Sequence, residues 1–211
     1  MPERQRIGIF GGTFDPIHLG HLIAATDLRH ALTLDRVLFV PAKRPPHKAG
    51  QIISADHHRL AMLRLAIDGE PAFAVDTIDL DRGGVSYTSD TIELLEERLR
   101  PAVLWFLMGI DSLRDLPTWH RPDQLARLAY LGVARRPGIE VDVESVLRQV
   151  PEARHRVSMV STVEIGISAS DLRRRVATGL PISYQVLPRV ERYIRDQRLY
   201  RSPDDTAVDP D

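Results

Sequence analysis

Two histidines that follow a pair of glycines near the start of the chain could hold phosphate oxygens. Gly11 and Gly12 come directly after a short apolar run and, without a Cβ, let a phosphate approach the backbone closely. A helical pattern begins near Leu22, and the start of a helix offers backbone N–H groups and the positive end of its dipole. His18 and His21 lie three residues apart, so both rings can project toward the same oxygens, whose negative charge would favour protonated rings. The combination predicts a triphosphate-binding site.

Each part of this pattern has a more common explanation when it occurs alone. A glycine pair is most often a turn, and a single histidine usually lies on the surface or makes its hydrogen bonds in the core. A zinc site needs three or four ligands, and this stretch has no cysteine. The complete stretch over residues 11–21, Gly-Gly-Thr-Phe-Asp-Pro-Ile-His-Leu-Gly-His, is far more specific than its parts.

This stretch resembles the His-x-Gly-His signature of a nucleotidyltransferase superfamily, which class I aminoacyl-tRNA synthetases share. In its longer form it is similar to the motif of bacterial nicotinate-nucleotide adenylyltransferases. The resemblance implies that His18 and His21 are catalytic. It also implies that the residues at the start of the motif bind ATP, namely Gly11, Gly12, Thr13 and Phe14.

The composition is that of a globular enzyme. The chain has 211 residues, enough for one α/β domain, of which 43% are hydrophobic and 27% charged. A formal net charge of −1 provides no general attraction to nucleic acid or to an anionic membrane. The absence of cysteine excludes disulfides, and no apolar run reaches the ~20 residues of a membrane span. Because the polar N-terminus leads straight into the first strand, without room for a signal peptide, we expect a cytoplasmic protein that binds neither nucleic acid nor membrane.

Hydrophobic periodicity predicts strands that alternate with helices. We expect strands at residues 7–10, 36–40, 73–80, 102–108, 129–134 and 157–160. We expect helices at residues 22–32, 56–68, 169–178 and 188–197, and one that contains Leu94, Leu95 and Leu99 and is capped by Ser89, Asp90 and Thr91. Residues 41–54 contain three prolines and a glycine, which indicates a loop.

This order of elements predicts a doubly wound, mainly parallel α/β sheet of the Rossmann-like nucleotidyltransferase type. We expect a single domain over residues 1–200, followed by a polar, disordered tail at residues 201–211. Ligands bind beyond the carboxyl ends of the strands in such sheets, and the glycine-histidine stretch falls there.

A loop with two prolines carries a lysine that could reach phosphate. The segment Arg44-Pro45-Pro46-His47-Lys48 resembles the Pro-Pro-His-Lys element of the same family, which implies a catalytic role for Lys48. The prolines restrict the loop, so less ordering is needed to place Lys48 on a phosphate. Taken alone, the segment would indicate only a basic surface loop with a solvated lysine.

Three segments resemble those that bind nicotinate mononucleotide (NaMN) in the family. Residues 85–91, Val-Ser-Tyr-Thr-Ser-Asp-Thr, resemble its Ser-Tyr-Thr-x-Asp-Thr stretch and imply that Thr88 binds NaMN, although such residues also cap helices. Trp119 offers a flat face to a pyridine ring, or is a core aromatic, and His120 stands where many relatives have tyrosine. Arg136, in an Arg-Arg-Pro-Gly element, could face an anionic group of the substrate or cap a strand end.

The expected ATP site continues at the end of the most apolar strand. Met108-Gly109-Ile110-Asp111-Ser112 resembles the family's Gly-x-Asp-Ser element. Gly109 allows close approach of the adenosine, and Asp111 can accept hydrogen bonds from ribose hydroxyls. Asp111 could instead only cap the helix that follows.

We expect the start of a second helix to contact the phosphates of ATP. Residues 167–173, Ile-Ser-Ala-Ser-Asp-Leu-Arg, resemble the family's Ile-Ser-Ser-Thr-x-Ile-Arg element. This implies that Ser168 and Ser170 bind ATP and that Arg173 is a catalytic, bidentate phosphate clamp, with Ala169 in place of the usual second serine. The alternative is a capped, basic helix without a ligand.

The resemblance implies a reaction of ATP with NaMN that gives deamido-NAD (NaAD) and pyrophosphate. The 5′-phosphate of NaMN would attack the α-phosphorus in line, and because it is already an anion it needs no general base. Mg²⁺ is implied as a cofactor that bridges phosphates and keeps several waters. The acid is expected to be preferred over the amide, because backbone N–H groups near Thr88 and Trp119 would favour its carboxylate. A homo-oligomer is compatible with the sequence.

Three other functions are compatible with parts of the sequence. Pantetheine-phosphate adenylyltransferases and cytidylyltransferases share His-x-Gly-His but resemble this chain little beyond it. A class I synthetase would need a second, lysine-rich loop and usually a tRNA-binding domain. A catalytically silent nucleotide sensor would not need His18, His21, Lys48 and Arg173 together, and a turnover assay with ATP distinguishes it from an enzyme.

Overall fold

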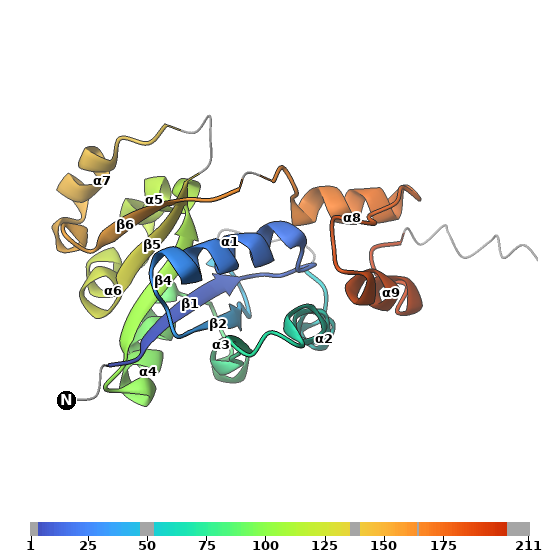
Figure 1. Ribbon diagram of the computed structural model, residues 1–211, viewed down its shortest axis with the longest axis horizontal. Helices are drawn as coiled ribbons and strands as arrows, with labels where there is room; N and C mark the ends of the chain where they lie inside the picture. The colour runs from blue at the N-terminus through green and yellow to red at the C-terminus, as the bar shows by residue number, and fades with distance from the viewer. Residues whose placement is uncertain (1–3, 47–52, 136–139, 164, 202–211) are drawn as a thin grey trace, which may run out of the picture.

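The centre of the molecule is a six-stranded sheet in which every pair of neighbours is parallel. The computed structural model describes residues 4–46, 53–135, 140–163 and 165–201. The strands are Arg6–Gly12 (β1), Arg36–Pro41 (β2), Phe73–Val75 (β3), Val103–Gly109 (β4), Tyr130–Arg135 (β5) and Val157–Ser161 (β6). Their order across the sheet is β3-β2-β1-β4-β5-β6, which confirms the predicted doubly wound fold (Figure 1).

Helices cover both faces of this sheet (Figure 1). They are Leu19–Ala31 (α1), Asp56–Ile67 (α2), Ile78–Arg82 (α3), Thr88–Leu99 (α4), Ile110–Asp115 (α5), Pro122–Leu128 (α6), Val143–Gln149 (α7), Ala169–Ala177 (α8) and Pro188–Asp196 (α9). Short 3₁₀ turns lie at Leu116–Thr118 (η2) and Pro151–Ala153 (η3). Helices α1, α2, α8 and α9 bury apolar side chains in one cluster, and α4, α5, α6 and α7 bury theirs in a second cluster.

The alternation of side chains along the strands produces these two clusters. In β1, Ile7 and Ile9 are 1% exposed and belong to the α4–α7 cluster, whereas Phe10 packs against the other cluster. Five consecutive residues of β4, Leu104–Met108, are buried because helices cover both sides of this central strand. The two clusters hold the carboxyl ends of β1 and β4 side by side.

Two predicted boundaries are wrong near the middle of the chain. The strand expected at residues 73–80 ends at Val75, and helix α3 follows, because the Asp76 carboxylate accepts a hydrogen bond from the N–H of Ile78 (3.1 Å) and starts a new turn. The helix expected to be capped by residues 89–91 begins at Thr88 with Tyr87 as N-cap, so those residues lie within its first turn. The first helix likewise begins at Leu19 rather than near Leu22.

Three helices of the α4–α7 face were not predicted from the sequence. Helices α5, α6 and α7 have six, seven and seven residues. Two turns or fewer give too few positions for an apolar period to be visible. The helices that were predicted, and the strands other than β3, lie within a few residues of their predicted positions.

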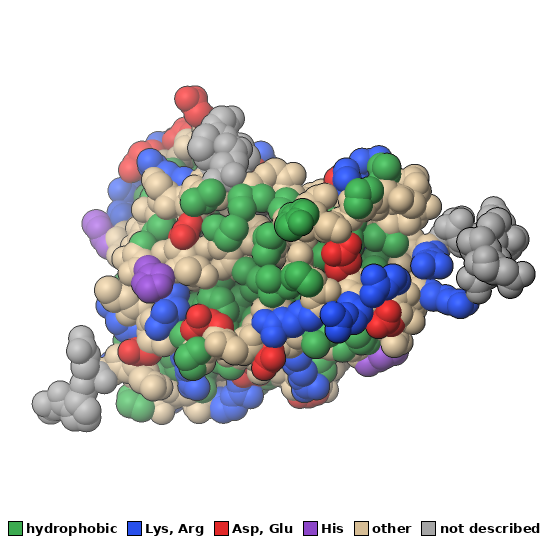
Figure 2. Space-filling view, turned by 45° about the vertical axis from the view of Figure 1, so that its right-hand side comes forward, with side chains coloured by type: hydrophobic (Ala, Val, Ile, Leu, Met, Phe, Trp, Pro, Cys, Tyr) green, Lys and Arg blue, Asp and Glu red, His purple; other side chains and the backbone are tan. Residues whose placement is uncertain are grey.

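Charges of both signs are distributed over the surface. On the face shown in Figure 2, Lys and Arg side chains form a row across the middle, with Asp and Glu side chains beside them. This mixture agrees with the formal net charge of −1. No helix in the described parts of the chain is long and apolar enough to cross a bilayer.

Candidate active site

A cleft of about 830 Å³ opens at the carboxyl ends of β1 and β4, where the order of the strands reverses. Nine of the residues predicted from the sequence line it: Gly11, Gly12, Thr13, His18, His21, Thr88, Gly109, Trp119 and Ser168. They come from β1, the starts of α1, α4 and α8, the end of β4 and the segment after η2. The parallel topology thus brings together motifs that are far apart in the sequence.

The two histidines form a stacked pair at the start of α1. Their ring centroids are 3.7 Å apart and their planes differ by 28°, so both rings present their edges in similar directions. The backbone N–H of His18 donates to Nδ1 of His21 (3.3 Å). In a neutral His21 ring the proton therefore lies on Nε2, which makes Nε2 a hydrogen-bond donor.

Gly20, the glycine between the histidines, is required by this arrangement and was not among the predicted site residues. A Cβ at position 20 would lie 3.1 Å from Nδ1 of His18 and 3.2 Å from Cε1. A side chain there would be in tight contact with the imidazole, which would have to shift by a few tenths of an ångström. Gly20 is part of the His-x-Gly-His motif, but the sequence does not indicate which side chain packs against a glycine in a helix.

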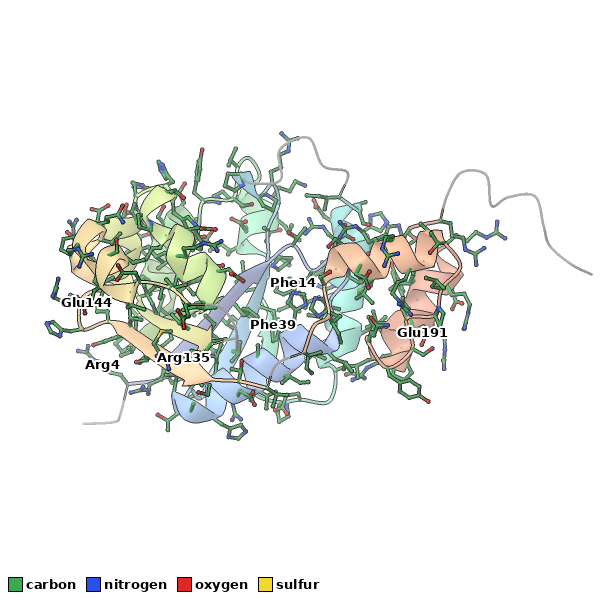
Figure 3. The ribbon with its side chains drawn as sticks, turned by 90° about the horizontal axis from the view of Figure 1, so that it is seen from above. Arg4, Phe14, Phe39, Arg135, Glu144 and Glu191 are labelled. Carbon is green, nitrogen blue, oxygen red and sulfur yellow. The ribbon has the colours of Figure 1, made fainter. Side chains whose placement is uncertain are left out.

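Phe14 supports the histidines from the core instead of lining the cleft. Its side chain is 2% exposed, and its ring lies edge-to-face against His21 (5.2 Å between centroids). The ring also packs on Phe39, beside which it is seen in Figure 3. A Cβ on Gly12 would lie 2.8 Å from the Phe14 ring, so the glycine accommodates this aromatic side chain.

Asp15 connects the first motif to the C-terminal part of the chain. This carboxylate is 2% exposed and accepts hydrogen bonds from the Tyr200 hydroxyl (2.6 Å) and the N–H of Ser54 (3.0 Å). Its backbone carbonyl accepts from Arg173 (2.7 Å). Burial, together with the neighbouring Asp15 charge, raises the pKa of Tyr200, so its hydroxyl stays protonated as a donor.

Arg59 is fully buried and binds three carbonyls around the site. Its guanidinium donates to the carbonyl oxygens of Thr13 (2.9 Å), Ala42 (2.8 Å) and Ser54 (3.1 Å). It also pairs with Asp56, which pairs in turn with Lys43. Burial raises the pKa of Asp56, but the bonds from Lys43 and Arg59 outweigh this and lower it overall. Sequence reasoning missed Arg59, because an arginine on an amphipathic helix is expected in solvent.

The start of α8 lies at the cleft as predicted, but some residues of the 167–173 motif do not line the cleft. Ser168 is the N-cap, lines the cleft and accepts from the N–H of Asp171 (3.2 Å). The hydroxyls of Ser168 and Ser170 are 3.2 Å apart, while Ser170 is not part of the cleft lining. Ala169 lines the cleft. Arg173 is half-buried and held on the Asp15 carbonyl outside the lining.

The end of β4 provides an open floor for the cleft. Gly109 is the N-cap of α5. Apart from its two chain neighbours, no atom of the described residues lies within 4 Å of where its Cβ would be, so a ligand can approach the backbone here. Asp111 lies in the first turn of α5, 3.9 Å from Arg114, and does not line the cleft. It is not the N-cap of the helix.

Aromatic side chains form the wall on the α4 side. Trp119 is half-buried, lines the cleft and packs edge-to-face on Phe106 (6.0 Å between centroids). The His120 ring lies on the Tyr87 ring, 4.3 Å between centroids. Thr88 is the first residue of α4 and lies beside this pair in the lining. Lys48 and Arg136, also predicted as site residues, lie outside the described residues.

Comparison with known proteins identifies the family. A family model described as cytidylyltransferase-like matches residues 9–175. The probable nicotinate-nucleotide adenylyltransferase of Thermomicrobium roseum is 56% identical over 198 residues, which cover 94% of this chain and 92% of the relative. The chain belongs to the nicotinate-nucleotide adenylyltransferase family. A second family member, from Herpetosiphon aurantiacus, is 43% identical over 93% of this chain and 98% of its own length.

Solved structures in the nicotinate-nucleotide adenylyltransferase family have the same fold. Nicotinic acid mononucleotide adenylyltransferase of Plasmodium falciparum, complexed with NaAD, aligns with a TM-score of 0.76 at 20% identity, covering 93% of this chain and 98% of that one. The same enzyme complexed with APC gives a TM-score of 0.75. These likenesses confirm the predicted Rossmann-like nucleotidyltransferase fold.

Proposed function

We propose that this protein transfers the adenylyl group of ATP to NaMN, giving NaAD and pyrophosphate in NAD biosynthesis. The observation that carries the proposal is the stacked His18–His21 pair of the family motif, which faces a cleft large enough for both substrates. Chains that are 56% and 43% identical to this one are named for the same reaction.

The phosphates of ATP are proposed to lie between the starts of α1 and α8. His18 and His21 would donate to phosphate oxygens from one side, and the N–H groups at the start of α8, next to Ser168, from the other. Gly109 would allow the adenosine to lie against the end of β4. Lys48 and Arg173 are proposed to compensate phosphate charge, and Arg173 would have to leave or share the Asp15 carbonyl to do so.

Catalysis is proposed to rest on alignment and charge compensation. The 5′-phosphate oxygen of NaMN forms a bond to the α-phosphorus while the bond to the bridging oxygen of pyrophosphate breaks. The attacking oxygen is an anion at neutral pH, so no residue has to remove a proton from it. Donors such as His21 Nε2 would stabilise the negative charge on the transferring phosphoryl oxygens.

Magnesium is proposed to enter with the triphosphate as part of the substrate. Mg²⁺ prefers phosphate oxygens and water in octahedral geometry. Within the described ranges, no group of three or more His, Cys, Asp or Glu side chains is placed to hold a metal ion. We propose that the residues at the site act on a metal-bound triphosphate, and we propose no protein ligand of the metal.

The pyridine ring of NaMN is proposed to lie against Trp119, with its carboxylate near the N–H groups at the start of α4, beside Thr88. Arg136 is proposed as a further contact to an anionic group. The test is pyrophosphate release with NaMN and with nicotinamide mononucleotide (NMN) in parallel. We expect kcat/KM to be at least about tenfold higher for NaMN. Equal kcat/KM values would contradict the proposed recognition of the carboxylate. No pyrophosphate release with either mononucleotide would contradict the proposed function.

A further inference from the structure

A negatively charged side chain stands in the first turn of the helix that is proposed to receive the substrate's carboxylate. Helix α4 begins at Thr88, and Asp90 is two residues further on. Tyr87, the N-cap, makes no side-chain capping bond, so the first N–H groups of α4 depend on other partners. An uncompensated Asp90 would oppose a second anion at this helix start.

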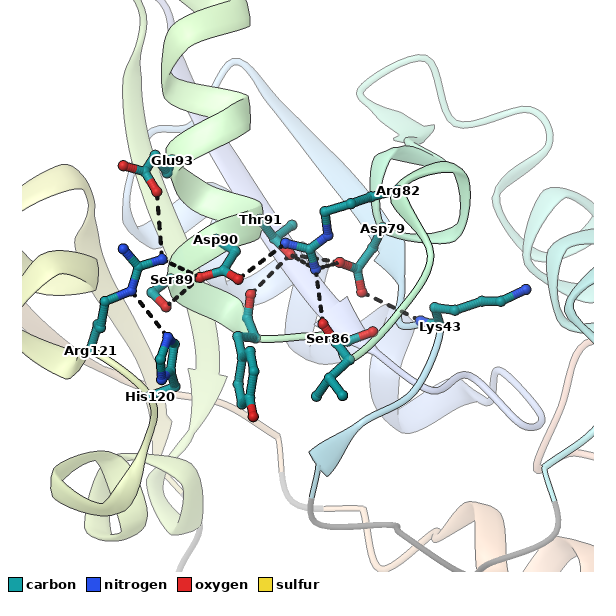
Figure 4. A network of polar contacts seen from close by, with 12 residues as sticks. Lys43, Asp79, Arg82, Ser86, Ser89, Asp90, Thr91, Glu93, His120 and Arg121 are labelled. Carbon is teal, nitrogen blue, oxygen red and sulfur yellow. Dashed lines mark hydrogen bonds and ion pairs between the residues drawn. The ribbon is translucent and has the colours of Figure 1, made fainter.

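Two arginines compensate Asp90, one from each side. Oδ1 of Asp90 lies 2.5 Å from the Arg121 guanidinium, and Oδ2 lies 3.6 Å from the Arg82 guanidinium (Figure 4). Burial raises the pKa of Asp90, but the bonds from Arg121 and Ser89 outweigh this, and the pKa is lowered overall. Asp90 is not part of the cleft lining, so its charge is held on the outer side of the turn.

Arg121 also holds the segment after η2 that lines the cleft beside the start of α4. It follows Trp119 and His120 directly and has a left-handed backbone (φ 47°, ψ 56°). Its Nε donates to Nε2 of His120 (3.2 Å), and the His120 ring lies on Tyr87. Arg121 thus joins the segment after η2 to the first turn of α4, beside the cleft in which the pyridine ring is proposed to bind (Figure 4).

We propose that Arg121 is a positioning residue that determines the preference for a carboxylate on the pyridine ring. It holds the segment after η2 beside the start of α4 and cancels the charge of Asp90, so that the start of α4 can accept an anion. This inference rests on the proposed function, because it assumes that NaMN occupies the cleft.

The test measures equilibrium binding of NaMN and NMN to Arg121→Gln, together with steady-state kinetics. We expect the ratio of the two dissociation constants to shift about tenfold toward NMN, with the KM for ATP unchanged. In Asp90→Asn/Arg121→Gln, which also removes the negative charge that Arg121 no longer pairs with, we expect NaMN affinity to recover toward the wild-type value. Arg127→Gln is the matched control, because Arg127 lies on α6 and pairs with Asp123 and Glu152 away from the cleft.

The proposal is overturned if Arg121→Gln keeps the wild-type ratio of dissociation constants, or if the double variant binds NaMN no better than Arg121→Gln. It is also overturned if Arg127→Gln shifts the ratio equally. If the wild-type protein binds NaMN but transfers no adenylyl group, the proposed function is contradicted. Because binding is measured separately from turnover, the ratio of dissociation constants still tests the role of Arg121 in that case.

Discussion

At the scale of single residues, the site depends on how few positions the two histidine rings can occupy. The Gly20 Cα faces the His18 ring, the His18 N–H binds the His21 ring, and Phe14 packs against the other side of His21. Each ring is therefore held before any substrate arrives. A preorganised donor is worth more to a transition state than a mobile one, because no reorganisation is needed during the reaction.

We predict that His18→Ala and His21→Ala each lower kcat by about 10²-fold or more, with a smaller change in the KM for NaMN. Both rings face the proposed position of the transferring phosphoryl group, so they stabilise charge that develops there. Steady-state kinetics on purified protein measures this effect. His30→Ala, an exposed histidine in the last turn of the same helix, is the control and should be unaffected. Wild-type kcat in either site variant would contradict the mechanism.

A second prediction concerns Gly20. Gly20→Ala adds only a methyl group, but that group would lie 3.1 Å from the His18 ring, which would have to shift by a few tenths of an ångström. We expect kcat to fall by about tenfold or more while thermal unfolding changes little, because alanine favours the helix. A variant with full kcat would show that the position of the His18 ring is not critical.

At the scale of elements, the first motif is held by segments that lie outside it. Arg59 on α2 binds the carbonyls of Thr13, Ala42 and Ser54, and so holds the end of the first motif and the described residues on either side of the gap between β2 and α2. Tyr200, after α9, binds Asp15 from the opposite side. The geometry of the phosphate site therefore depends on α2 and on the C-terminal helices.

We predict that Arg59→Met destabilises the protein by about 3–5 kcal/mol, because three buried carbonyls and Asp56 lose a charged partner. Arg59→Lys should lose less, since an ammonium can replace part of the bonding. Urea unfolding measures both changes. Arg64→Met is the control, because Arg64 is exposed on the same helix. The account of Arg59 fails if Arg59→Met is as stable as Arg64→Met.

The elements also show what could be predicted from the sequence and what could not. β1, α1 and the start of α8 were predicted because glycines, periodicity and capping residues mark them locally. Helices α5–α7 were missed because they are too short to show a period. The strand at residues 73–80 was predicted too long because the turn that the Asp76 carboxylate stabilises was not identified. The roles of Arg59 and Arg121 depend on partners distant in the sequence, and local pattern carries no information on these.

At the scale of the whole molecule, contacts between α2 and α9 attach the C-terminal helices to the sheet domain. Nδ1 of His58 lies 3.0 Å from the Tyr193 hydroxyl, and the two rings pack edge-to-face. Burial lowers the pKa of His58, and the charge of neighbouring His57 lowers it further. The folded protein thus takes up a proton on His58 less readily than the unfolded chain does.

The lowered pKa of His58 in the folded protein predicts how stability changes with pH. Above the unfolded pKa of 6.5 the His58 contribution is complete, and it is lost as pH falls through the lower folded value. We expect His58→Gln to show a smaller loss of unfolding free energy between pH 7.5 and 5 than the wild type, measured by urea unfolding at each pH. His30→Gln, at an exposed position, should keep the wild-type slope. Identical slopes in all three proteins would contradict this account.

In the proposed reaction, the α-phosphoryl group of ATP moves to the 5′-phosphate of NaMN. The most direct test incubates the protein with NaMN, Mg²⁺ and ATP labelled at the α-phosphate, and follows the label by chromatography. We expect the label to appear in NaAD, with one equivalent of unlabelled pyrophosphate, and His18→Ala and His21→Ala to slow this transfer. Label found only in AMP or ADP, or left in ATP while NaMN is unchanged, would contradict the proposed reaction.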